Sequence, residues 1–111
     1  MQPQLFQQLD DSTKIEEVLL YALGDFQSRG KVLANRELAL DRLHGTFIRA
    51  CRKFGIGQLS DEIVVKGLRE LGVSVSELPP FIAKRPFRIM VSKELSDKSL
   101  VVFEAERRLT N

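Results

Sequence analysis

Residues 36–54, RELALDRLHGTFIRACRKF, carry the strongest periodic pattern in the chain. Apolar side chains recur there every three or four residues, at Leu40, Leu43, Phe47, Ala50 and Phe54. This spacing is typical of the buried face of an amphipathic α-helix, because such a helix turns once in about 3.6 residues. It predicts one long helix over 36–54, with Asn35 as its N-cap and Gly55 as the residue that ends it.

A second helix is predicted ahead of this segment, over residues 13–29. Its buried stripe consists of five apolar side chains, Ile15, Val18, Leu19, Ala22 and Phe26. Thr13 and Glu16 have the spacing of a capping box, in which each side chain bonds a free backbone amide at the start of the helix. Residues 1–12 are rich in glutamine, and we expect them to form a loosely ordered arm.

A third helix is expected over residues 61–71. Ser60 is a good N-cap residue for it, and Gly72 stands where a C-terminal cap glycine belongs. Residues 73–86 lack a helical period and contain three of the four prolines. They predict a crossing loop, or a short strand at 73–75 followed by such a loop.

Apolar and polar side chains alternate in two runs near the end of the chain. The apolar positions are Phe87, Ile89 and Val91 in the first run and Val101, Phe103 and Ala105 in the second. This alternation is typical of half-buried strands, and residues 94–99 between the runs favour a turn. The sequence therefore predicts an antiparallel hairpin whose edges need cover from the 73–75 strand, the N-terminal arm or a second copy of the chain.

These elements predict an α+β fold of three helices followed by a C-terminal antiparallel β-hairpin. Residues 13–108 would form a single domain behind the arm of residues 1–12. A chain of 111 residues, 43% hydrophobic and 29% charged, is long enough and apolar enough to bury a core. No stretch approaches the ~20 apolar residues of a membrane span, and the N-terminus lacks the features of a secretion signal. We therefore expect a cytoplasmic protein that does not engage a membrane.

Side chains able to carry out catalysis are few. His44 is the only histidine, and no acid or serine stands at the spacing of a catalytic triad. Cys51 is the only cysteine, which excludes an intrachain disulfide and a site of several thiolates, and its neighbours predict a buried structural thiol. No glycine-rich phosphate loop is present. We expect a protein that is not an enzyme and uses no cofactor or metal; the alternative is His44 or Cys51 acting in a pocket.

Positive charge is concentrated in two parts of the chain. Residues 29–57 have a net charge of +5 and residues 84–111 one of +3, although the whole chain carries only +2. Seven cations are candidates for binding a polyanion or a partner: Arg42, Arg49, Arg52, Lys53, Lys84, Arg85 and Arg88. Arg42, Arg49 and Lys53 would form a column on the long helix, where phosphates could accept charge-assisted hydrogen bonds. The intramolecular alternative is that acids of the preceding helix, Glu16, Glu17 and Asp25, neutralise this column.

Two classes of function are compatible with these patterns. The first is a small non-enzymatic binding or adaptor module that acts through a protein partner or through self-association. The second is a nucleic-acid-binding regulator, because three helices followed by a hairpin resemble the winged-helix arrangement, in which the third helix enters the major groove and the hairpin contacts the backbone. Three features depart from that arrangement. The 36–54 helix is about twice the usual length, the 61–71 helix begins with Asp61 and Glu62, and a crossing loop separates it from the hairpin.

Overall fold

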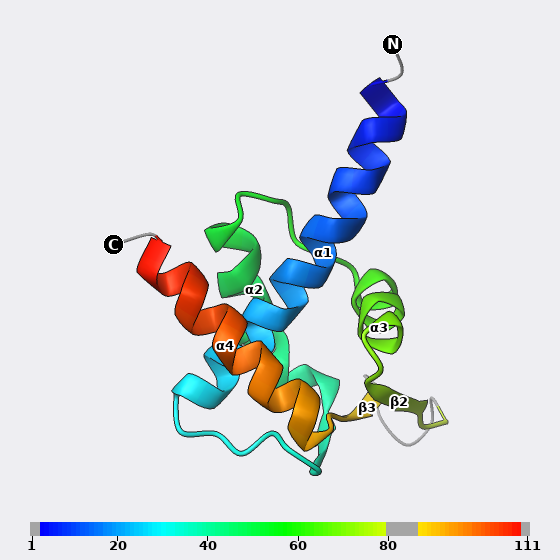
Figure 1. The fold of residues 1–111 in the computed structure, drawn as a ribbon. Coiled ribbons are helices and arrows are strands. Elements are labelled where there is room, and N and C mark those ends of the chain that lie inside the picture. Colours follow the sequence, from blue (N-terminus) through cyan, green and yellow to red (C-terminus); the bar gives the residue numbers. More distant parts are fainter. Residues whose placement is uncertain (1–2, 80–86, 110–111) are drawn as a thin grey trace.

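The chain combines helices with a small antiparallel sheet whose strands come from between the helices (Figure 1). The computed structural model describes residues 3–79 and 87–109, with side chains from residue 14 onward. In this part the elements are α1 (Pro3–Ser28), β1 (Glu37–Ala39), the 3-10 helix η1 (Leu40–Leu43), α2 (His44–Lys53), α3 (Asp61–Glu70), β2 (Ser74–Glu77), β3 (Phe87–Met90) and α4 (Lys93–Leu109). The strand order is β1–β3–β2, and both pairs are antiparallel. The mixed α and β class is confirmed, but the order of three helices and then a hairpin is wrong.

The first helix is longer than predicted. α1 begins at Pro3, so residues 3–12 of the expected arm are helical, and Thr13 lies inside the helix rather than at its cap. The N-terminal end of α1 projects beyond the body of the molecule in Figure 1. The rest of α1 contributes a buried face to the core through Val18, Leu19, Ala22, Leu23 and Phe26. None of the described helices is long and apolar enough to cross a membrane.

Residues 36–54 do not form one helix. They divide into β1, η1 and α2, and only the last of these is α-helical. Leu38 and Leu40 are buried in or next to the strand, and Leu43 and Phe47 continue the buried series into the helix. The predicted series starts at Leu40 in η1 and continues through α2, so its helical spacing gave no sign of the strand that precedes it, which explains the wrong prediction. Asn35 has a φ of +55° and its backbone N–H donates to the Val91 carbonyl at 2.7 Å, so it leads into β1 instead of capping a helix.

β3 is the central strand of the sheet. Its Ile89 lies opposite Leu38 of β1 and Val75 of β2. The short strand expected at 73–75 is confirmed as β2, and the first strand of the predicted hairpin is confirmed as β3. The second strand of that hairpin is wrong, because β1 and β2 occupy the two edges of β3 and satisfy its backbone groups.

α4 stands where the second hairpin strand was predicted. Ser92 caps it: the Ser92 Oγ accepts from the Leu95 backbone N–H at 3.1 Å, and the Ser92 carbonyl accepts from the Ser96 N–H at 2.9 Å. Its buried face consists of Ser96, Ser99 and Phe103. Two serines at helical spacing give no hydrophobic signal, so only the alternation over 101–105 was visible in the sequence.

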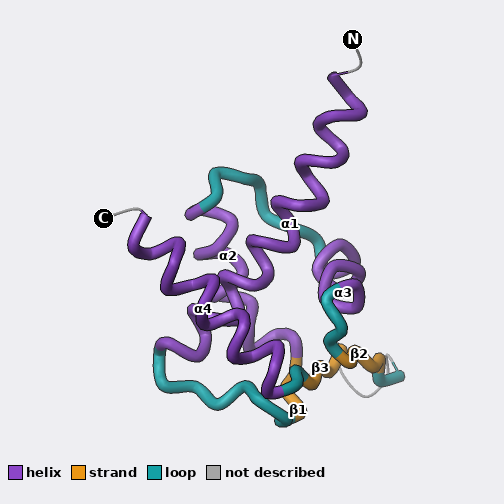
Figure 2. The backbone as a smooth tube through the Cα atoms, viewed as in Figure 1, coloured by secondary structure: helices purple, strands orange, loops and turns teal. Residues whose placement is uncertain are grey.

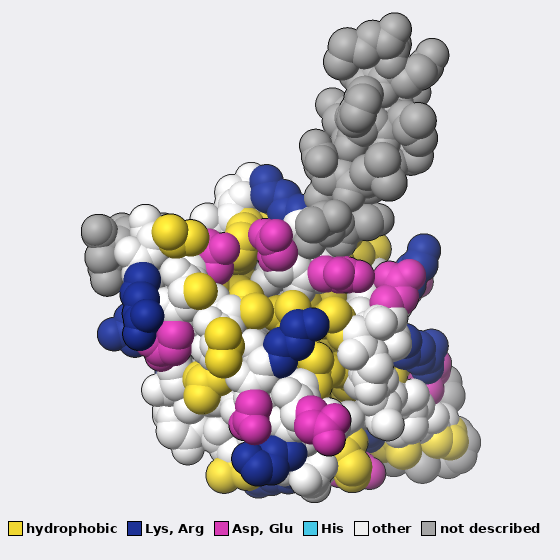
Figure 3. All heavy atoms as spheres, viewed as in Figure 1, with side chains coloured by type: hydrophobic (Ala, Val, Ile, Leu, Met, Phe, Trp, Pro, Cys, Tyr) yellow, Lys and Arg dark blue, Asp and Glu magenta, His cyan; other side chains and the backbone are white. Residues whose placement is uncertain are grey.

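Small residues bring the backbones of α4 and α1 close together where the helices cross (Figure 2). A Cβ placed on Gly24 would collide with the Cβ of Phe103 and the carbonyl oxygen of Ser99. Gln27 links the two helices, because its Nε2 donates to the Ser96 carbonyl and to the Ser99 Oγ, both at 2.8 Å. The opposite face of α4 is open, and Figure 3 shows hydrophobic side chains along it with charged side chains beside them.

Candidate functional site

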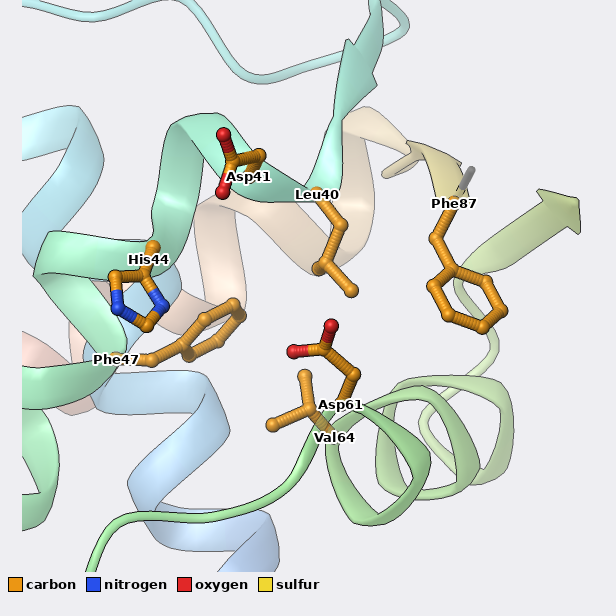
Figure 4. Close-up of a pocket in the computed structure, with 7 residues that line it drawn as sticks. All are labelled: Leu40, Asp41, His44, Phe47, Asp61, Val64 and Phe87. Carbon is orange, nitrogen blue, oxygen red and sulfur yellow. The ribbon is translucent and has the colours of Figure 1, made fainter. Parts of the chain in front are cut away.

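His44 lies at a narrow pocket between η1, α2, α3 and β3 (Figure 4). The pocket is lined by Leu40, Asp41, His44, Phe47, Asp61, Val64 and Phe87. Figure 4 shows the Asp61 carboxylate pointing into the space below Leu40, whereas the Asp41 side chain turns away from it. The free volume is about 10 Å³, close to the minimum that one water molecule requires. As its described residues lie, the pocket has room for about one water molecule.

Cys51 takes no part in this pocket. It is 3% exposed and packs in the hydrophobic core, as predicted for a structural thiol. Of the two residues named in the enzyme alternative, only His44 lines this pocket. Among the described residues, no group of three His, Cys, Asp or Glu side chains could hold a metal ion.

α3 is fixed by its inner face and open on its outer face. Ser60 caps it as predicted, with its Oγ accepting from the Ile63 backbone N–H at 3.3 Å. Val64, Val65 and Leu68 are buried, and Gly67 faces α1 so closely that a Cβ there would lie 2.5 Å from the Leu19 Cδ1. The inner face therefore docks on α1, which leaves the polar face directed outward.

An open hollow of about 480 Å³ lies between the outer face of α3 and the sheet. It is lined by Glu62, Val65, Lys66, Arg69, Glu70, Glu77 and Phe87. Lys66 and Arg69 are exposed and three residues apart, so they project from the same face of the helix. Arg69 also joins α3 to β2, because its Nη2 donates to the Val75 carbonyl at 3.4 Å. A hollow lined by residues of both charges is better suited to contact the charged surface of a partner than to bind an apolar small molecule.

Arg49, one of the predicted cations, is engaged within the chain. Its Nε donates to the Asp25 Oδ2 at 2.7 Å, and Arg29 and Thr46 donate to the same carboxylate at 3.0 and 2.8 Å. Burial alone raises the pKa of Asp25, but the hydrogen bonds from Arg49, Thr46 and Arg29 outweigh it and hold this pKa below its ordinary value. For Arg49 the intramolecular alternative therefore applies, since it neutralises a carboxylate that is 5% exposed.

Lys53 is also engaged within the chain. Its Nζ lies 5.9 Å from the centre of the Tyr21 ring and donates to the Glu106 carbonyl at 3.4 Å. Burial, and next the charge of Asp25, raise the pKa of Tyr21 above its ordinary value. Lys53 therefore contacts both α1 and α4, which reduces its freedom to reach a phosphate.

The other candidate cations come from separate elements. Arg42 is exposed on η1 and Arg52 is exposed on α2, whereas Arg88 is half-buried on β3. Lys84 and Arg85 lie outside the described residues. Since Arg42 precedes α2, the expected column of cations along one helix is not present in the described part of the chain.

Two surfaces were not predicted from the sequence. Lys66 and Arg69 stand among acids in a part of the chain with a negative net charge, so their common face on α3 was the only available signal. The exposed side of α4 was missed because part of this helix was predicted to be a strand. Comparisons with protein-family models, with curated proteins and with solved structures gave no match.

Proposed function

We propose that this chain is a non-catalytic nucleic-acid-binding module of the winged-helix type. In this proposal α3 enters a groove of the duplex, and the β2–β3 hairpin contacts the backbone. The observation that carries the proposal is the order of the elements. α2 and α3 are followed at once by an antiparallel hairpin, and β1 completes the sheet as its third strand.

Two of the departures from the winged-helix arrangement no longer stand. α2 has 10 residues, which suits a short positioning helix, and β2 begins at Ser74, soon after α3 ends at Glu70. The third departure is reduced, because Asp61 lines the narrow pocket beside Phe47 instead of the outer face (Figure 4). Glu62 remains at the start of the outer face.

The charges on the proposed interface come from α3 and from the hairpin connection. Lys66 and Arg69 are exposed on α3 and supply donors for phosphate oxygens or base edges. Lys84 and Arg85 belong to the sequence that connects β2 to β3, the part that contacts the backbone in such domains. Binding would be weak and sensitive to salt, since Glu62 and Glu70 stand beside the two α3 cations.

A binding titration tests this proposal. Labelled random-sequence duplex and single strand are titrated with the full chain at two ionic strengths, and we expect duplex binding at low salt that falls as salt rises. Lys66→Ala should weaken binding severalfold and lower the salt dependence by about one counterion. Lys31→Ala is the matched control, because the connector between α1 and β1 lies away from α3 (Figure 2). Absence of binding at low salt would eliminate the proposal.

A second candidate function is a protein-binding or adaptor module that acts through a partner or through self-association. It is favoured by the outer face of α4, where Val101 is 68% and Leu109 79% exposed. Exposed apolar side chains that cluster on one helix commonly mark a protein contact. Sedimentation across a wide concentration range tests self-association, and a strictly monomeric chain would count against it.

A further inference from the structure

The outer face of α4 carries a stripe of seven residues at helical spacing. Its members are Glu94, Asp97, Lys98, Val101, Glu104, Ala105 and Arg108. They occupy the side of the helix opposite Ser96, Ser99 and Phe103, which face α1. Part of this stripe lines an open hollow of about 530 Å³. We call these seven residues the α4 stripe.

Charges in the α4 stripe are arranged symmetrically about Val101. Glu94 lies seven residues before Val101 and Arg108 seven residues after it, and Lys98 and Glu104 lie three residues before and after it. Glu94 and Glu104 therefore each have a base at the same distance on the other side of Val101. Among the described residues, these four side chains take part in no ion pair of their own.

We propose that two copies of this chain pair through the α4 stripe, antiparallel, with the two-fold axis at Val101. Antiparallel pairing brings each position before Val101 level with the matching position after it on the other copy. Glu94 of one copy then meets Arg108 of the other, and Lys98 meets Glu104. Each pair occurs twice in the dimer.

The same symmetry excludes a parallel pairing in register. A parallel pair would set each charged residue against its own copy, so that like charges oppose each other along the seam. In the antiparallel arrangement Val101 packs on Val101, and Ala105 lies level with Asp97 and leaves room for its side chain. Asp97 already has a cation from its own helix, since Lys93 Nζ lies 3.3 Å from its Oδ2.

The expected dimer is weak. A single pair of helices buries less than the ~1,200 Å² that marks the lower end of stable specific interfaces. The chain should therefore dissociate on dilution. The inference deepens the self-association hypothesis by naming its surface and orientation, and it does not depend on nucleic-acid binding.

Sedimentation velocity of the full chain without nucleic acid tests the inference. We expect a monomer–dimer equilibrium whose dissociation constant rises at least tenfold in Val101→Glu. Val101 is largely exposed, so circular dichroism should find this variant folded. Lys31→Glu, at an exposed lysine in the connector between α1 and β1, is the control that should leave dimerisation unchanged.

Charge reversal tests the orientation. Glu94→Arg and Arg108→Glu should each weaken the homodimer, whereas a mixture of the two variants should form a heterodimer tighter than either homodimer. A homodimer that these single substitutions leave equally stable would overturn the antiparallel register, because a parallel pair already opposes like charges at both positions. A dimer that Val101→Glu leaves intact would overturn the α4 stripe as its surface but keep self-association, and a monomer at every concentration would contradict both.

Discussion

α4 and α3 both pack on α1, but they do so in different ways. The contact with α4 is the more extensive; it brings backbones together at Gly24 and is tied by Gln27 to the serines of α4. The contact with α3 is formed by aliphatic side chains, with Gly67 against Leu19. The first joins helices that lie far apart in the sequence. The second holds α3 so that its charged face stays outside.

The comparison separates residues that hold the fold together from exposed residues that are available to bind a partner. The α1–α4 contact uses small and polar residues that have a partner within the chain. The outer face of α3 carries Lys66 and Arg69 beside a hollow that no described side chain fills. Substitutions on the α1–α4 side should therefore change stability, and those on the α3 side should change binding.

The largest expected effect on stability comes from comparing a phenylalanine in the α1–α4 contact with one beside the α3 hollow. Phe103 is 6% exposed and its ring centre lies 4.9 Å from that of Tyr21, so Phe103→Ala should lower the free energy of unfolding by about 3–5 kcal/mol. Phe87 is half-buried at the rim of the α3 hollow, and Phe87→Ala should cost less than half as much. Urea unfolding measures both, and equal losses would remove the contrast between the two sides.

The next effect concerns the close approach of α1 and α4. Gly24→Ala adds a Cβ that collides with Phe103 and Ser99, and overpacking of this kind costs about 1–3 kcal/mol. Gly57→Ala is the control, because a Cβ there meets nothing within 4 Å. If Gly24→Ala unfolds at the same urea concentration as the parent chain, the two helices are not in close contact.

The buried carboxylate of Asp25 should make stability depend on pH. Its pKa in the folded chain lies below the unfolded value of about 3.9, so the ionised form stabilises the fold. This contribution is complete above the unfolded pKa and is lost as the pH falls through the folded pKa. Unfolding curves at several acidic pH values should show the loss, and Asp25→Asn should flatten this part of the profile.

The smallest effect separates two neighbouring serines of α4. Ser99 Oγ donates to the Ser96 carbonyl at 2.7 Å and accepts from Gln27, so Ser99→Ala should destabilise the chain by about 1 kcal/mol. Ser96 Oγ is buried and has no hydrogen-bond partner among the described residues, so Ser96→Ala should be neutral or stabilising. Thermal unfolding of the two variants provides the comparison, and a reversed order would contradict the hydrogen bonding described for α4.

The elements that the sequence predicted are those with local signals. Ser60 and Gly72 bound α3 by cap chemistry that needs only neighbouring residues, and the short strand before the prolines depends on a few apolar side chains. α4 could not be found in this way, because two of the three residues it buries are Ser96 and Ser99, whose role appears only when Gly24 and Gln27 of α1 lie against α4. The 36–54 segment failed for a related reason, since β1 forms by pairing with a strand about fifty residues away.

The candidate interface was predictable only in part. The order of the predicted elements already resembled a winged helix. The cations proposed for its interface, however, came from the two parts of the sequence with the most net positive charge. Arg49 and Lys53 have partners within the chain, which sequence spacing alone could not reveal. Lys66 and Arg69 are two cations among acids, and only the outward orientation of α3 distinguishes them.

An amide chemical-shift titration with a short random-sequence duplex at low salt tests the proposed function most directly. The account predicts shift changes in α3 and in β2 and β3, with the amides of α4 unaffected at a protein concentration where the chain is monomeric. Shift changes confined to α4, or none at any duplex concentration, would contradict it.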